Sequence, residues 1–136
     1  MVSEKGNVLA VERWKGEPDD VGNIEFYHEY DKEAMKVEVD GKGRIINISK
    51  EIGKWEAWGE YIGFARIEDV NKLRRAVNYL VKAGHVQDWY ESALNVMVKF
   101  YKTVIHPCPL MGNERWVEID TPEDLKIARK LFHSQE

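Results

Sequence analysis

The sequence predicts one α/β domain with a mixed sheet, a β-hairpin and flanking helices. Short apolar runs rich in β-branched residues alternate with turn-forming residues in the first half of the chain. Two stretches with apolar residues at helical spacing follow, and a strand and a helix close the chain. This order of strands, hairpin, helices and a final β–α pair is typical of a layered α/β or α+β domain.

Size and composition limit the classes of protein that the chain can represent. Its 136 residues suit one domain, so residues 1–136 are assigned to a single domain. A hydrophobic share of 43% with 32% charged residues predicts a globular chain, and a net charge of -4 argues against a nucleic-acid partner. No apolar run reaches the roughly 18 residues of a membrane helix, and no apolar signal region follows the first five residues. We expect a cytoplasmic protein.

Six short runs predict strands, at residues 7–11, 35–39, 44–48, 60–67, 103–106 and 116–119. The second and third form a hairpin, because residues 40–43 (DGKG) tolerate positive φ. Pro107 and Pro109 are expected to stop the fifth run. Gly63 marks a place in the fourth run where a backbone or a ligand comes close. Residues 15–23 are dense in turn formers and predict an exposed loop.

Three helices are predicted in the second half of the chain. Apolar residues at helical spacing indicate one over residues 70–81, ended by Gly84, and another over residues 89–98. The last helix has the clearest start signals. Thr121 is a good N-cap, a proline follows it, and Asp124 at the third helical position completes an imperfect capping box.

Four features of the sequence carry no chemical prediction. The glycines around Lys42 lack the rest of a nucleotide-binding glycine motif, so they predict a turn. His28 lacks the second histidine of H-E-x-x-H. Cys108 is the only cysteine, with no partner for a disulfide or a zinc site, and His106 is expected to be structural.

The strongest chemical signal is residues 116–125, WVEIDTPEDL. Glu118 and Asp120 are two residues apart on a predicted strand, so their carboxylates point to the same face. The strand leads into a helix, at the kind of position where α/β folds bind ligands. Two carboxylates there suit Mg²⁺, which is held by few protein oxygens together with substrate phosphates. The alternative is that Glu118 faces solvent and Asp120 helps to cap the helix, and the spacing favours neither reading.

This segment resembles the closing motif of the sugar-phosphate and alcohol-phosphate nucleotidyltransferases, in which W-x-E-I-D-T precedes the last helix. The resemblance implies that Asp120 is the first magnesium ligand and Glu118 the second. Residues 37–50, VEVDGKGRIINISK, are similar to the hairpin of that family, which ends in a lysine that contacts the phosphate of the acceptor. Lys50 takes this position, and an ammonium group suits a phosphate. The alternative for Lys50 is an ordinary surface lysine.

Two further segments resemble the acceptor pocket of the same family. Residues 59–64, GEYIGF, look like its pocket-lining strand, which implies that Glu60 and Tyr61 contact the acceptor. Asp88 begins a stretch, DWYE, similar to the one that opens the next helix and reaches the acceptor. Trp89 and Tyr90 belong to that stretch too, but they fit the apolar core-facing side of the helix equally well. The four segments occur in family order, closest to the cytidylyltransferases that activate phosphocholine or inositol phosphate.

The nucleotide-binding signals of that family are not in this sequence. There is no G-x-G-x-R loop after a first strand and no further metal-binding aspartate, so the chain resembles only the C-terminal, acceptor-side half. In the complete family fold, Mg²⁺-dependent attack by the acceptor's phosphate on an NTP releases pyrophosphate. Three hypotheses follow: a fragment or split subunit that needs a separate nucleotide-binding half, a non-catalytic remnant that binds a phosphorylated small molecule, or a structural, dimerising module. We expect self-association under all three, because a severed half must cover its exposed face.

Overall fold

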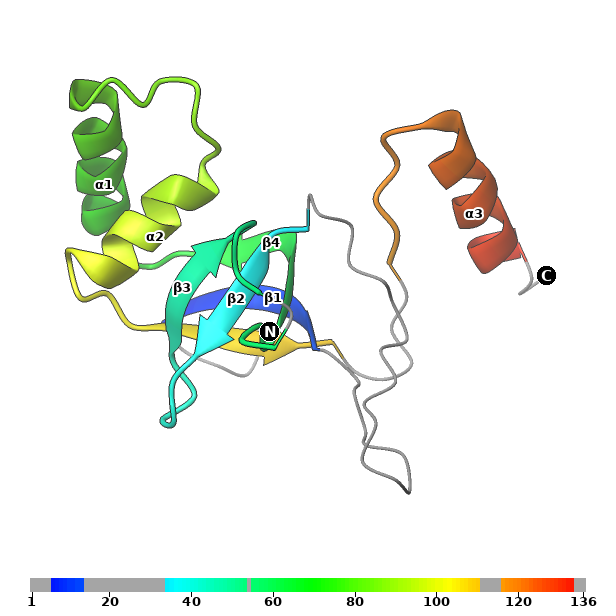
Figure 1. The fold of residues 1–136 in the computed structure, drawn as a ribbon, viewed down its shortest axis with the longest axis horizontal. Coiled ribbons are helices and arrows are strands. Elements are labelled where there is room, and N and C mark those ends of the chain that lie inside the picture. The colour runs from blue at the N-terminus through cyan, green and yellow to red at the C-terminus, as the bar shows by residue number, and fades with distance from the viewer. Residues whose placement is uncertain (1–5, 14–33, 54, 111–115, 134–136) are drawn as a thin grey trace.

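A computed structural model describes residues 6–13, 34–53, 55–110 and 116–133 of the chain. Four strands come first, followed by two helices, a fifth strand and a third helix, and they form an α/β fold with an open five-stranded mixed sheet (Figure 1). The architecture is compatible with a Rossmann-like fold. The elements in chain order are β1 (Asn7–Arg13), β2 (Lys36–Val39), β3 (Ile45–Ser49), β4 (Gly59–Arg66), α1 (Val70–Lys82), α2 (Glu91–Lys99), β5 (Ile105–Pro109) and α3 (Pro122–His133).

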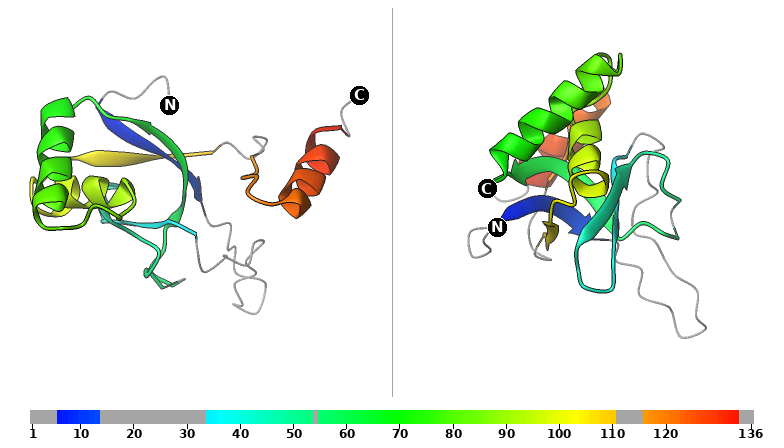
Figure 2. Two further views of the ribbon diagram at one scale, coloured as in Figure 1. Left: turned by 90° about the horizontal axis from the view of Figure 1, so that it is seen from above. Right: turned by 90° about the vertical axis from the view of Figure 1, so that its left-hand side faces the viewer.

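The sheet has the strand order β3-β2-β4-β1-β5. β1 pairs antiparallel with β4 and parallel with β5, and β2 pairs antiparallel with β3 and with the beginning of β4. A hydrogen bond of 3.3 Å joins His106 Nδ1 on β5 to the carbonyl oxygen of Gly43 in the β2–β3 turn, so the two edges of the sheet approach each other. α1 and α2 pack at one end of the sheet, whereas α3 lies beyond the other end (Figure 2).

The core lies between the sheet and the pair α1 and α2. The apolar run predicted as a strand is buried from Asn7 to Val11, because β1 lies between two other strands. Leu9 and Val11 face a cluster that includes Ala76 of α1 and Met97 of α2. Asn95 of α2 also accepts a hydrogen bond from the backbone N–H of Ile48 on β3, at 3.1 Å. This bond sets the position of α2 against the end of β3.

The predicted end of α1 at Gly84 and the predicted start of α3 at Thr121 are confirmed, whereas α2 begins two residues later than predicted, at Glu91. Gly84 has φ +85, and its N–H donates to the carbonyl of Val81 while the N–H of His85 donates to Leu80, which is the Schellman arrangement. At the start of α3, the N–H of Asp124 donates to Thr121 Oγ1 (3.2 Å) and the N–H of Thr121 donates to Asp124 Oδ2 (2.9 Å). Aspartate therefore completes a reciprocal capping box despite being one methylene shorter than the usual glutamate. No described helix is long and apolar enough to cross a membrane.

Two strand predictions are wrong. β5 does not stop at the prolines but continues through both Pro107 and Pro109. The N–H of Leu110, just after β5, donates to the carbonyl oxygen of Val11, so the N–H groups of even-numbered residues in β5 point toward β1. The backbone nitrogens of Pro107 and Pro109 point the other way, to the open edge of the sheet. The missing N–H groups of the two prolines therefore cost no hydrogen bond between strands. Residues 116–119 form no strand, because β propensity needs a pairing partner and no described strand lies beside them. The loop predicted over residues 15–23 and His28 lie outside the described residues.

Candidate functional site

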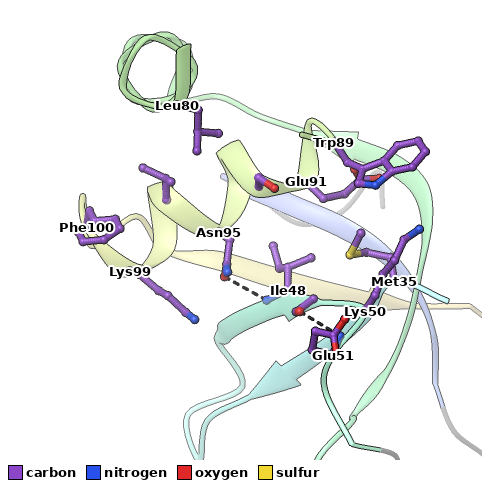
Figure 3. A pocket seen from close by; sticks show the side chains of 13 residues that line it. Met35, Ile48, Lys50, Glu51, Leu80, Trp89, Glu91, Asn95, Lys99 and Phe100 are labelled. Atoms are coloured by element: carbon purple, nitrogen blue, oxygen red, sulfur yellow. Dashed lines mark hydrogen bonds between the residues drawn. The ribbon is translucent and has the colours of Figure 1, made fainter. Parts of the chain in front are cut away.

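A cavity of about 560 Å³, here called the Lys50 cavity, opens where five separate described parts of the chain meet. They are the residues before β2, the residue after β3, the first half of β4, the start of α2 with the residues before it, and the segment before α3. The lining residues are Ala34, Met35, Lys50, Glu60, Tyr61, Ile62, Gly63, Trp89, Glu91, Trp116, Glu118 and Asp120. A second pocket of about 370 Å³ between β3 and α2 shares Met35, Lys50, Trp89 and Glu91 with it (Figure 3).

Lys50 is held in place by its backbone and by its side chain. The buried ammonium of Lys36 donates to the carbonyl oxygen of Lys50 at 2.7 Å and to that of Ala34 at 3.2 Å. The Nζ atom of Lys50 lies 4.6 Å from the centroid of the Trp89 indole, a cation–π distance. Lys50 is half-buried. Its charge is therefore presented from a defined position at the wall of the cavity.

Tyr61 lines the cavity and is joined to Tyr90, which is not among the lining residues. The two hydroxyl groups share a hydrogen bond of 2.7 Å, and the rings meet edge to face. Burial, together with the hydrogen bond to Tyr90, raises the pKa of Tyr61 far above its ordinary value, and burial also raises the pKa of Tyr90. Both phenols stay protonated at neutral pH. Glu91, which lines the cavity beside them, has a buried carboxylate oxygen, Oε2, without a hydrogen-bond partner among the described residues.

Carboxylates outnumber cations around the cavity. Among the described lining residues, four are acidic, Glu60, Glu91, Glu118 and Asp120, and Lys50 is the basic one. This acidic lining favours a ligand that carries a positive group or arrives with a metal ion. A phosphate ester alone would be repelled by this lining.

Glu118 and Asp120 lie in the exposed segment that leads to α3. The first turn of α3 is capped by Thr121 and Asp124, and only the backbone N–H of Asp120 takes part, donating to Asp124 Oδ2 at 3.1 Å. The carboxylate of Asp120 is therefore not the helix cap. Among the described residues no group of three or more His, Cys, Asp or Glu could hold a metal ion. Two carboxylates fit Mg²⁺ only if phosphate oxygens and water complete its octahedron.

The structure brings most of the residues named from the sequence together. Lys50, Glu60, Tyr61, Glu118 and Asp120 all line the Lys50 cavity, as does Trp89. The core alternative for Trp89 is wrong, because α2 begins two residues after it and the residue is 65% exposed.

Asp88 is not part of this lining. Its carboxylate lies 3.3 Å from Nδ1 of His85 in the loop between α1 and α2. Sequence reasoning also missed Glu91, which follows Trp89 and Tyr90 in the DWYE segment. Its place at the start of an amphipathic helix resembles an ordinary first-turn acid, so only the fold distinguishes it.

Comparison with protein-family models and with curated proteins gave no match for this chain. Function is therefore inferred from the residues of the cavity and their chemistry.

Proposed function

We propose that the chain is the acceptor-side half of a Mg²⁺-dependent nucleotidyltransferase that acts on a phosphorylated sugar or alcohol. One observation carries this proposal. Lys50, the Glu60–Tyr61 pair and the Glu118–Asp120 pair come from three segments far apart in the sequence, yet they line one cavity. These are the positions that the resemblance assigns to phosphate contact, acceptor contact and metal binding.

The residues have separate roles in this proposal. Lys50 neutralises the phosphate of the acceptor. Trp89 contacts the ammonium group of Lys50, and the hydrogen bond from Lys36 to the carbonyl oxygen of Lys50 fixes the backbone that carries it. Tyr61 and Glu60 orient the rest of the acceptor from β4. Glu118 and Asp120 would hold Mg²⁺, which would neutralise phosphate charge during the transfer. With an NTP bound by a nucleotide-binding half, an oxygen of the acceptor phosphate attacks the α-phosphorus, the bond to the β-phosphate oxygen breaks and pyrophosphate leaves.

An apolar surface around α3 supports the view that the chain is incomplete. Ile119, Ile127 and Phe132 each have about half of their surface exposed, and Ala128 is the only buried residue of the helix. Large apolar side chains on a helix are normally buried against a partner element. A separate nucleotide-binding half or a second copy of the chain would cover it.

The lack of a G-x-G-x-R loop in the sequence favours a second candidate function, a non-catalytic protein that binds a phosphorylated small molecule. This candidate uses the same cavity and the same Lys50. It differs only in the fate of the bound molecule.

Thermal unfolding and pyrophosphate release together test the proposal. With Mg²⁺ present, phosphocholine or inositol phosphate should raise the melting temperature of the chain, because the ligand binds only the folded state. Lys50→Ala should abolish the shift. Lys42→Ala, in the exposed β2–β3 turn, is the matched control and should retain it.

Each result separates the hypotheses. The chain alone should release no pyrophosphate from CTP with either acceptor, and release would show that it is not half of an enzyme. A melting temperature that no phosphorylated sugar or alcohol raises would contradict acceptor binding and favour a structural, dimerising module.

A further inference from the structure

The helices α1 and α2 occupy one end of the molecule (Figure 2), and this end carries an excess of positive charge. Residues 70–110 contain six lysine and arginine residues and two acidic ones, although the whole chain has a net charge of -4. The two acids, Asp88 and Glu91, precede or begin α2, whereas Lys99 ends it and Lys102 follows it. The charge of this part of the chain is therefore opposite to that of the chain as a whole.

Three cations at this end, Arg75, Lys99 and Lys102, are exposed. None of them forms an ion pair with a carboxylate of the described residues. Asp40 lines the same depression as Lys99 and Lys102, but its carboxylate is bound by the guanidinium of Arg44 at 2.9 Å. Within the described structure these three charges are not neutralised, which favours an anionic partner.

Two exposed aromatic rings lie among these cations. Phe100 is 64% exposed and Tyr79 is 48% exposed, and their ring centroids are 5.6 Å apart. Phe100 and Lys99 are neighbours at the end of α2 (Figure 3). The guanidinium of Arg75 lies 4.9 Å from the ring of Tyr101, the residue after Phe100. A pair of large rings left in contact with water marks an interaction surface.

Aliphatic side chains extend this surface toward the β2–β3 hairpin. Ile46 and Val104 are each almost half exposed, and they line a shallow depression together with Lys99 and Lys102. Apolar side chains bordered by ammonium groups suit a partner with apolar groups behind an anionic surface, which is the construction of a lipid bilayer. Nucleic acid offers phosphates and polar base edges, so the aliphatic side chains would have no counterpart in it.

We propose that this basic end, defined by Arg75, Tyr79, Lys99, Phe100 and Lys102, docks on an anionic lipid surface. Phe100 and Tyr79 enter the headgroup region, and the three cations contact the negatively charged headgroups. The chain is then held at the surface from outside. The inference does not rest on the proposed nucleotidyl transfer, because the basic end shares no residue with the Lys50 cavity.

Sedimentation of the full chain with lipid vesicles tests the proposal. Phosphatidylcholine vesicles with about one third phosphatidylserine should bind the chain, pure phosphatidylcholine vesicles should not, and added salt should weaken the binding. Lys99→Gln and Lys102→Gln should each lower the partition coefficient about fivefold through the lost charge. Phe100→Ser leaves the charge unchanged and should lower it about tenfold through the lost apolar contact.

Matched controls are available on α3. Lys126→Gln removes another exposed charge, and Phe132→Ser removes another phenylalanine with about half of its surface exposed. Both should bind anionic vesicles as the wild type does. All of these positions are exposed, so the melting temperatures should stay close to that of the wild type.

Several outcomes would overturn the inference. One is the absence of binding to anionic vesicles. Another is an equal loss in the α3 controls, which would indicate attraction by the overall charge and not docking through one end. Unchanged binding of Phe100→Ser would contradict insertion, and capture of a single-stranded oligonucleotide without binding to vesicles would assign the surface to nucleic acid. Lys50→Ala should keep vesicle binding, so failure of acceptor binding and failure of lipid docking are separate results.

Discussion

Replacing Asn7 by alanine should lower the free energy of unfolding by about 3 kcal/mol. Asn7 is buried at the start of β1 and ties three elements together. Its Oδ1 accepts from the backbone N–H groups of Glu68 (2.8 Å) and Asp69 (3.1 Å) at the turn into α1. Its Nδ2 donates to the Asp69 carboxylate (2.8 Å) and to the carbonyl of Val104 before β5 (3.1 Å).

The magnitude follows from these four bonds. A hydrogen bond between neutral groups contributes about 1 kcal/mol and one to a charged group somewhat more, so their loss amounts to about 4 kcal/mol. Glu68 is exposed, so water replaces part of what is lost, which gives the lower figure. Urea unfolding with linear extrapolation measures the change. Asn78→Ala on the exposed side of α1 is the matched control and should change stability by less than about 0.5 kcal/mol.

An ionisable substitution at the same position adds a test by pH. Asn7→Asp places a second carboxylate beside that of Asp69, so the folded state raises the pKa of the new group. Stability should then fall as the pH rises above about 4 and partly recover on acidification. A loss below about 1 kcal/mol for Asn7→Ala, or a pH-independent Asn7→Asp, would refute the account of this junction.

Three further predictions concern the site and its support. The fold raises the pKa of Tyr61, so the stability that this group contributes is complete below pH 10, its ordinary pKa, and is lost at higher pH. Tyr61→Phe should therefore make the decline of the free energy of unfolding at alkaline pH shallower, as measured by urea unfolding. An unchanged slope would contradict this prediction. Gly59→Ala should lower the free energy of unfolding by about 3 kcal/mol in the same assay, because the added Cβ would lie 2.5 Å from the carbonyl oxygen of Glu12. A Cβ at Gly41 would meet nothing within 4 Å, so Gly41→Ala is the control and should be nearly neutral. Asp120→Asn should weaken calorimetrically measured Mg²⁺ binding about tenfold, and equal affinities for this variant and Glu123→Gln would remove Asp120 from the metal site.

Local signals predicted the parts of the fold that depend on nearby residues. The DGKG turn, the glycine after α1 and the Thr121–Asp124 cap each act through hydrogen bonds within a few residues, so the sequence alone was sufficient. The two failures depended on distant strands. The prolines of β5 are tolerated because their backbone nitrogens point away from β1. Residues 116–119 form no strand because no described strand lies beside them.

For the site too, the sequence identified single residues but not their arrangement in space. The motif resemblance named Lys50, Glu60 and Asp120 individually, but no periodicity in the sequence shows that they line one cavity. Their convergence depends on the sheet order and on the segment before α3.

Amide chemical shifts during a titration with phosphocholine and Mg²⁺ test the central claim most directly. We predict that the resonances of Lys50, Glu60, Tyr61 and Asp120 move together, with one common saturation curve, and that omission of Mg²⁺ weakens the response. Shifts confined to one of these segments, or no saturable shifts at any of them, would contradict the claim that they form one acceptor site.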